Sequence, residues 1–230
     1  MTEEMDFERL WRGKFVRCLD EMVGTELRGE IARGWDELTA PPKPGEVIAW
    51  TQAAMQRLES LVDEPTRQEV MIRCACQYPL EDLQDIRRAY QQSGDIDLAQ
   101  RMLRERFETF LRHTLQLDDE LIRDILGKGW GLAGVLQGDC IIATKIPKSG
   151  NLVKYMRETD PQVKRQLYCH CPRLRRAIST GALVPATYCY CGAGFYRGIW
   201  EEITQHPVQV EVLESVLQGG QVCRVAIHLG

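Results

Sequence analysis

The chain has 230 residues, long enough to bury a full hydrophobic core in one large domain or two small ones. Its apolar fraction of 44% and charged fraction of 27% are typical of soluble globular proteins, and its net charge of −4 excludes a strongly basic nucleic-acid-binding protein. No apolar run approaches the roughly 20 residues that a membrane-spanning helix needs.

The N-terminal sequence MTEEMDFERLW begins with acidic residues and lacks the apolar stretch of a signal peptide, which predicts a cytoplasmic protein. The chain contains nine cysteines. Cytoplasmic cysteines stay mostly reduced, so metal binding or thiol chemistry is a better explanation for them than a disulfide framework.

The N-terminal half has helical periodicity from Met5 to about Leu126. Gly24 ends a first helix, and Asp97 is expected to cap a long one. The spacing of apolar residues predicts further helices over Glu26–Leu38, Val47–Leu61, Pro65–Cys76, Leu80–Gln92 and Asp119–Leu126.

Cys74 and Cys76 form a Cys-x-Cys pair at the end of a predicted helix. Residues two apart on a regular helix point to nearly opposite sides, so we interpret them as small buried hydrophobes. Fraying of the helix near Pro79 would let both reach one ion. Cys18, on an apolar helix face, is assigned to the core.

A glycine-rich run, Gly127–Gly134, surrounds Trp130. It lacks both a preceding strand and a GKS or GKT ending, so it matches neither a dinucleotide-binding motif nor a P-loop. We interpret it as a hinge between a helical region, residues 1–128, and a second domain, residues 129–230.

The second domain is expected to combine helices with a small antiparallel sheet, which gives the whole chain an α+β fold. Its predicted elements are a strand over Asp139–Ile146, helices at Asn151–Arg157, from Asp160-Pro161 and over Gly192–Gln205, and strands over Val208–Val216 and Val222–Leu229. Gly219-Gly220 predicts a two-residue hairpin turn. That turn would place Glu214 opposite Val225, on an apolar face where its carboxylate needs a metal or an arginine as partner.

Two Tyr-Cys-x-Cys units, Tyr168–Cys171 and Tyr188–Cys191, lie 20 residues apart, and Cys223 follows in the closing strand. In an extended segment, cysteines two apart point the same way. Zinc prefers four tetrahedral thiolate or imidazole ligands, and these five cysteines suffice, with His170 in reserve. An iron–sulfur cluster, redox-active or catalytic thiols, and plain buried cysteines remain alternatives.

Cations and aromatic residues surround the same cysteines. Arg173, Arg175 and Arg176 would lower a thiol pKa, bind a carboxylate or phosphate, or form a solvated helix face. The aromatic residues would either wall an apolar pocket or form the core of the domain. The candidate ligand-binding residues are Tyr168, Tyr188, Tyr190, Phe195, Tyr196, Trp200, Trp130 and Arg173.

The segment GAGFYRGIWEEITQHPVQVEVLESVLQGGQVCRVAI resembles the end of the four-vinyl-reductase-type, or hydrocarbon-binding, domain. The shared pattern is a small-residue helix, a proline-led strand, a glycine turn and a closing Cys-Arg strand. The resemblance is good over Cys189–Leu229 and loose over Trp130–Tyr188. The family includes sensor domains of aromatic-responsive regulators and a bacteriochlorophyll-biosynthesis protein.

This resemblance implies a zinc site. Some members hold zinc with a cysteine before the helix, an acid and a cysteine in the first hairpin strand, and the closing-strand cysteine. Cys189 or Cys191, Glu214 and Cys223 match these positions, whereas Ser215 stands about where the strand cysteine would be. The paired Cys-x-Cys units also resemble uncharacterised relatives, some named as thiazoline-carboxylate hydrolases.

These patterns together predict a protein that binds a small apolar or aromatic molecule in a domain stabilised by cysteine-ligated zinc. The expected ligands are Cys189, Cys191 and Cys223, joined by Cys169 or Cys171. The alternatives are a cysteine- or metal-dependent hydrolase of small amides or heterocycles, and a thiol redox sensor. We expect no direct contact with nucleic acid or membrane, and a homodimer is left open.

Overall fold

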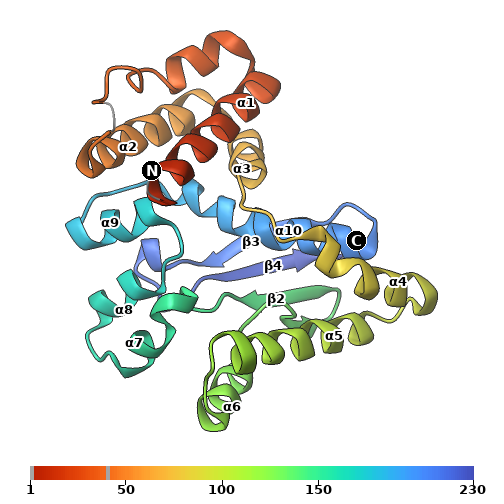
Figure 1. Ribbon diagram of the computed structural model, residues 1–230. Helices are drawn as coiled ribbons and strands as arrows, with labels where there is room; N and C mark the ends of the chain where they lie inside the picture. The colour runs from red at the N-terminus through yellow and green to blue at the C-terminus, as the bar shows by residue number, and fades with distance from the viewer. Residues whose placement is uncertain (1–2, 40–41) are drawn as a thin grey trace.

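The computed structural model describes residues 3–39 and 42–230 and has an α+β fold (Figure 1). Single 3-10 or π turns are labelled η. The helices are α1 (Glu3–Ile31), α2 (Pro44–Leu61), α3 (Glu64–Arg73), η1 (Leu80–Leu83), α4 (Gln84–Ser93), α5 (Ile96–Thr109), η2 (Phe110–Thr114), α6 (Asp119–Gly127), η3 (Ser149–Asn151), α7 (Leu152–Arg157), α8 (Pro161–Tyr168), α9 (Pro172–Thr180), η4 (Ala186–Cys189), α10 (Tyr190–Thr204) and η5 (Val216–Gln218). The strands are β1 (Val135–Gln137), β2 (Cys140–Thr144), β3 (Gln209–Glu214) and β4 (Arg224–His228).

The first two predicted helices form one element, α1, with a kink at Gly24. The backbone of Gly24 has φ 84° and ψ 166°, which interrupts the helix where the sequence predicted a break. The helix after the kink ends at Ile31, earlier than the predicted Leu38.

Aspartate side chains cap four of the helices. Asp63, Asp118 and Asp160 accept hydrogen bonds from backbone amides at the starts of α3, α6 and α8. The long helix α5 is capped by Asp95, whose carboxylate accepts from the amides of Asp97 and Leu98 at 2.9 and 3.1 Å. The predicted cap at Asp97 was therefore wrong by two residues.

The four strands form one antiparallel sheet in the order β1-β2-β4-β3. The sequence predicted β2, β3 and β4 but not the short β1, which precedes β2 across a tight turn. In Figure 1 the sheet lies in the middle of the molecule, with α10 along one side of it and α5 beyond β2 on the other.

The connection between β3 and β4 differs from the predicted two-residue turn. Glu214 pairs with Arg224, and Val212 pairs with Val225. Strand β3 therefore ends several residues before Gly219-Gly220, and β4 begins several residues after it. A β-bulge between Val212 and Glu214 shifts the register, and η5 fills the connecting loop. Glu214 therefore does not lie opposite Val225, and Cys223 lies just outside β4.

The glycine-rich run after α6 is hydrogen-bonded to the sheet instead of forming the predicted hinge. Trp130 forms a parallel bridge with Thr144, and the amide of Gly131 donates to the carbonyl of Thr144 at 2.9 Å. Gly131 has φ +121°, and a Cβ atom there would lie 2.7 Å from the Phe107 ring. Glycine is required at this position for both reasons.

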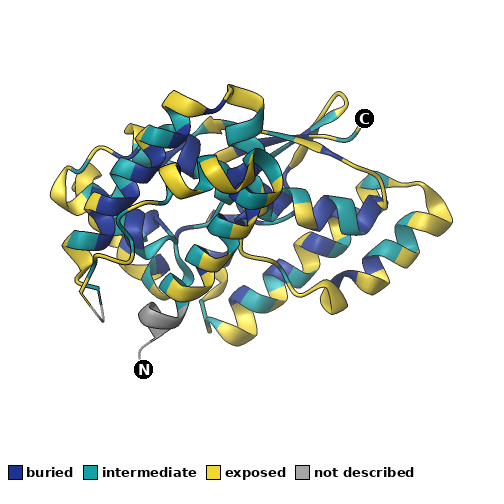
Figure 2. Cartoon of the chain, turned by 90° about the horizontal axis from the view of Figure 1, so that it is seen from above, coloured by how far each residue is buried: buried dark blue, intermediate teal, exposed yellow. Residues whose placement is uncertain are grey.

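Two hydrophobic clusters form the interior, and both contain residues from either side of position 128. The first joins α1, α2 and α3 to α7, α8 and α9, and the second joins α4 and α5 to α10 and the sheet. Figure 2 shows buried positions on the inward faces of the helices and along the strands. Within the described residues, no helix is long and apolar enough to cross a membrane.

Candidate functional site

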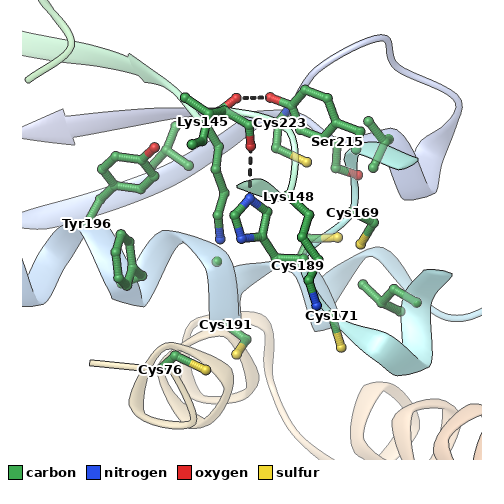
Figure 3. Close-up of a pocket in the computed structure, with 18 of the residues that line it drawn as sticks. Cys76, Lys145, Lys148, Cys169, Cys171, Cys189, Cys191, Tyr196, Ser215 and Cys223 are labelled. Atoms are coloured by element: carbon green, nitrogen blue, oxygen red, sulfur yellow. Dashed lines mark hydrogen bonds between the residues drawn. The ribbon is translucent and has the colours of Figure 1, made fainter. Parts of the chain in front are cut away.

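All five cysteines of the predicted site line one cavity, which has a volume of about 1120 Å³. They come from three separate segments of the chain, and Cys76 from a fourth segment joins them (Figure 3). The thiols that line the cavity are those of Cys76, Cys169, Cys171, Cys189, Cys191 and Cys223.

The first Tyr-Cys-x-Cys unit is an extended linker between two helices. Tyr168 is the last residue of α8, and Pro172, directly after the unit, is the first residue of α9. Proline suits this position because the first residue of a helix has no intrahelical acceptor for an amide hydrogen. Cys169 and Cys171 both have extended backbone angles and both line the cavity, but in Figure 3 the Cys169 sulfur lies near those of Cys189 and Cys223, whereas the Cys171 sulfur lies on the side of Cys191. The sequence predicted a helix that starts at Asp160-Pro161 and runs into this segment, and α8 does so, but the predicted shared direction of the two side chains is not seen.

The second unit is helical. Cys189 ends η4, and Cys191 lies in the first turn of α10, so the two side chains diverge. Figure 3 shows the Cys189 sulfur on the same side as those of Cys169 and Cys223, whereas the Cys191 sulfur lies beside Cys76. The Cys191 thiol donates to the carbonyl of Cys74 at 3.5 Å, which directs it toward the end of α3.

Tyr168 fixes the relative positions of the first unit and the sheet. Its hydroxyl donates to the carbonyl of Lys145, just after β2, and accepts from the amide of Cys223 at 3.0 Å, just before β4. The amide of Lys145 in turn donates to the carbonyl of Cys223 at 2.9 Å. The buried Tyr168 therefore positions the backbone of two cavity residues.

Tyr188, in the second unit, contacts both the cysteines and the N-terminal helix. Its ring stacks on Trp11 with the centroids 5.4 Å apart, and its hydroxyl lies 3.4 Å from the sulfur of Cys171. The N-terminal helix therefore closes one side of the site, a contribution that the sequence did not predict.

The proposed aromatic wall is only partly present. Tyr168, Tyr188, Phe195 and Tyr196 line the cavity. Trp200 is fully buried among α10 and the sheet, Trp130 packs against Tyr155, and Tyr190 also lies outside the lining. These three residues belong to the alternative that the sequence left open, the core of the domain.

Arg173 does not line the cavity. Its guanidinium pairs with Glu8, with Nε 2.7 Å from the carboxylate, and lies 3.9 Å from the centre of the Trp11 ring. Its side chain is 1% exposed. Arg173 therefore joins α9 to α1, and Arg175 is the arginine of this segment that reaches the cavity.

Four of the cavity thiols, those of Cys169, Cys189, Cys191 and Cys223, have raised pKa values, which keep them protonated near neutral pH. Burial raises the pKa values of Cys169 and Cys223, and it raises those of Cys189 and Cys191 to about 12. Neighbouring thiols add to the shift for Cys169, Cys189 and Cys191, because one thiolate disfavours another. A bound cation would remove this penalty.

His170 is held as a neutral imidazole. Its Nε2 lies 2.9 Å from the carbonyl of Ile146, which can only accept, so Nε2 carries the proton and Nδ1 is bare. Burial, together with the charges of Lys145, Lys148 and Arg175, lowers the pKa of His170 to about 3. A fixed tautomer of this kind is typical of metal-binding histidines.

Glu214 lines the cavity but already has partners. Its Oε1 accepts from the amides of Gln221 and Val222 at 2.8 and 3.3 Å, and its Oε2 lies 3.7 Å from Arg224. The predicted arginine partner is therefore present. The side chain is 30% exposed, so the carboxylate is only partly buried and not buried as its apolar face predicted.

The donor atoms suit zinc in type and number, but they do not yet surround a common point. Among the described residues, no group of three His, Cys, Asp or Glu side chains is arranged to hold a metal ion. Ser215, at the position where the related family has a cysteine, is buried on the cavity wall. Its hydroxyl hydrogen-bonds Cys189 and lowers the pKa of that thiol, against the larger effects of burial and Cys223.

The sequence missed Cys76 and the two lysines Lys145 and Lys148 as cavity residues. Helix α3 ends at Arg73, three residues before the predicted end, which releases Cys76 from the helix while Cys74 stays buried. The sequence signal for this early end is Pro79, near which fraying of the helix is expected. The sequence around the two lysines does not indicate that they reach the cavity, because both lie in the loop after β2, where exposed lysines are common.

Comparison with known proteins gives one match. A family model described as a family of unknown function, DUF6144, matches residues 151–229. The matched segment runs from α7 to the end of β4 and includes the five predicted cysteines. No curated protein matches the chain, and no solved structure matches it.

Proposed function

We propose that this protein binds a small, partly apolar molecule in its cysteine-lined cavity and that a zinc ion ligated by four of the thiols forms part of the cavity wall. The observation that carries the proposal is that cysteines from three separate segments line one cavity. Cysteines placed only for packing have no reason to meet at a cavity surface.

The ligand set that the geometry supports best is Cys169, Cys171, Cys189 and Cys223. Cys169 and Cys171 project from one extended linker, and the Cys189 and Cys223 sulfurs lie on the side of the cavity where Cys169 lies (Figure 3). Cys191 is directed to the Cys74 carbonyl, so it is the least suited of the five. Small side-chain rotations would have to bring the four sulfurs together, because they do not yet form a metal site.

The resemblance to the hydrocarbon-binding domain family supports the same reading, since that family combines an apolar ligand with a zinc site in some members. The chain departs from it at Ser215, and Cys169 and Cys171 supply the missing thiolates. The proposal also assigns the protein to the cytoplasm, where thiols remain reduced.

The alternatives of a cysteine-dependent hydrolase and a redox sensor need a reactive thiolate. Burial raises the pKa values of Cys189 and Cys191 to about 12, so these thiols are protonated and poorly nucleophilic at neutral pH. A closed four-thiolate site also favours a structural metal, because catalytic zinc keeps an open coordination position.

The test is to measure metal per chain after anaerobic purification without an affinity tag, by native mass spectrometry and elemental analysis. We expect about one zinc ion per chain, because four thiolates satisfy one tetrahedral ion. An iron–sulfur cluster would instead give iron, inorganic sulfide and visible absorption. Chelation should lower the melting temperature by roughly 10 °C or more, since binding of a structural metal contributes to the free energy of folding.

Variants assign the ligands. Cys223→Ser should lose most of the metal, whereas Cys140→Ser, in β2 and outside the cavity lining, should keep it. Metal content near zero in the unaltered protein, with Cys189 and Cys191 freely alkylated in the folded state, would reject the zinc site and favour thiol chemistry.

A further inference from the structure

The charged side chains on the cavity wall are mostly cationic. They are Arg106, Lys145, Lys148, Arg175 and Glu214. Arg106 pairs with Asp85 at 2.8 Å, and Glu214 is held by Arg224 and two loop amides. Among the described residues, Lys145, Lys148 and Arg175 form no ion pair with a carboxylate.

These three cations come from neighbouring segments. Lys145 and Lys148 follow β2, and Arg175 lies in the first turns of α9. In Figure 3 the side chains of Lys145 and Lys148 both extend into the cavity, toward the side where Cys171 and Cys191 lie. His170, in the linker before α9, cannot offset their charge, because an imidazole is either neutral or cationic.

Aromatic side chains line another part of the same cavity. Phe107 and Phe110 reach it from α5 and η2, and Phe195 and Tyr196 from α10. A volume of about 1120 Å³ is far larger than an inorganic anion needs. The lining therefore suits a molecule that has both an apolar body and a charged group.

We infer that the ligand is an organic anion, with an apolar body against the phenylalanines and a carboxylate or phosphate group held by Lys145, Lys148 and Arg175. Half-buried cations without a counterion are unfavourable, and a bound anion would give them charge-assisted hydrogen bonds. This inference rests on the proposed binding function and adds the chemical class of the ligand.

The cations have one other candidate role, which is to offset the charge of the metal-bound thiolates. Four thiolates around zinc carry a net charge of −2, and nearby lysines would stabilise it. The two roles differ in what a lysine substitution changes: the preference for anions in the first case and the metal content in the second.

The experiment uses the full chain as isolated and four ligands that share one ten-carbon chain: decanoate, decyl phosphate, 1-decanol and decylamine. Calorimetry or tryptophan fluorescence gives each dissociation constant below the micelle concentration. We expect at least one of the two anions to bind at least about tenfold more tightly than decanol, the ratio for one charge-assisted hydrogen bond, and decylamine to bind most weakly. The dissociation constants of decanoate and decyl phosphate, compared with each other, show whether a carboxylate or a phosphate is preferred.

Lys145→Met, Lys148→Met and Arg175→Met should each reduce the anion preference and leave decanol binding unchanged. Lys154→Met, an exposed lysine on α7, is the matched control and should change neither. The inference is overturned if decanol binds as tightly as both anions, or if the triple variant keeps the preference for an anion. It is also overturned if the variants lose metal while that preference survives. If none of the four compounds binds, the binding function fails, and the inference fails with it.

Discussion

At the scale of single residues, the two tyrosines that precede the Cys-x-Cys pairs have different tasks. Tyr168 bonds the Lys145 carbonyl and the Cys223 amide, both of them partly buried backbone groups. Within the described part of the chain, the Tyr188 hydroxyl hydrogen-bonds only the Cys171 sulfur, and sulfur is a weak partner. The sequence shows two near-identical units, and only the fold distinguishes them.

Tyr168→Phe should therefore destabilise the protein by ~1–3 kcal/mol, because it leaves a backbone donor and acceptor without their partner. Tyr188→Phe is the matched control, with an expected change below ~0.5 kcal/mol, because its ring still stacks on Trp11. Thermal or denaturant unfolding measures both. Equal losses in the two variants would contradict the special role of the Tyr168 hydroxyl.

The residue types of the site could be predicted from the sequence, but their positions could not. The extended backbone considered for the first Cys-x-Cys pair is present at Cys169 and Cys171, but the two sulfurs do not lie together. Arg173 and Arg175 are equivalent in the sequence. Only the helical phase of α9 and the position of Glu8 on α1 decide that Arg173 is buried and Arg175 lines the cavity.

At the scale of elements, α10 organises the molecule. It carries Cys191 at its start, packs against the sheet and crosses α3 at close range. The approach to α3 depends on Gly194: a Cβ atom there would lie 2.1 Å from the carbonyl oxygen of Ile72. The sequence predicted this helix nearly to the residue, but a small side chain does not reveal which backbone it contacts.

Gly194→Ala should destabilise the protein by ~1–3 kcal/mol, the usual cost of overpacking, because α10 and α3 must move apart. Gly198→Ala, one turn later, has open space around the new methyl group and should stabilise the helix by ~0.5–1 kcal/mol. Both variants replace a glycine of α10 by alanine, so the gain in helix propensity is the same for both. The difference between their stabilities therefore measures the close contact with α3. Stabilisation by both substitutions would show that the close contact is absent.

The elements that the sequence failed to predict are those set by tertiary contacts. The β3–β4 connection has the glycine pair of a tight hairpin, yet Glu214 and Ser215 bond the loop amides and stabilise a longer loop. This loop carries Cys223 out of β4 and toward Tyr168. The glycine pair favours a tight turn, but the side-chain hydrogen bonds that form in the folded chain favour the longer loop.

At the scale of the whole molecule, the N-terminal helices are part of the site. Trp11 and Phe7 of α1 line the cavity together with residues of α9 and α10. The sequence predicted a helical region beside a ligand-binding domain, and it gave no reason to bring α1 to the cysteines. That contact joins residues more than 150 positions apart, for example Glu8 and Arg173, and no local pattern encodes it.

The Glu8–Arg173 pair gives the last prediction. Arg173 is 1% exposed, one of its nitrogens has no hydrogen-bond partner among the described residues, and Trp11, Trp35 and Trp50 lie around its guanidinium. The ring faces stabilise the cation only in part, so it depends on the Glu8 carboxylate. Removing one member of a buried pair leaves the other charge uncompensated, which typically costs ~3–5 kcal/mol.

Glu8→Gln should accordingly lower the free energy of unfolding by about 3 kcal/mol or more, and it should loosen α1 from α9 so that cavity thiols react faster with alkylating agents. Asp36→Asn is the matched control: it breaks an equally short pair with Arg12, but Asp36 is 88% exposed, so the expected loss is below ~0.5 kcal/mol. Denaturant unfolding measures the first effect, and mass spectrometry of alkylated Cys171 and Cys189 the second. If Glu8→Gln unfolds like the control and its thiols stay equally protected, α1 does not close the site, and the cavity is a property of the C-terminal residues alone.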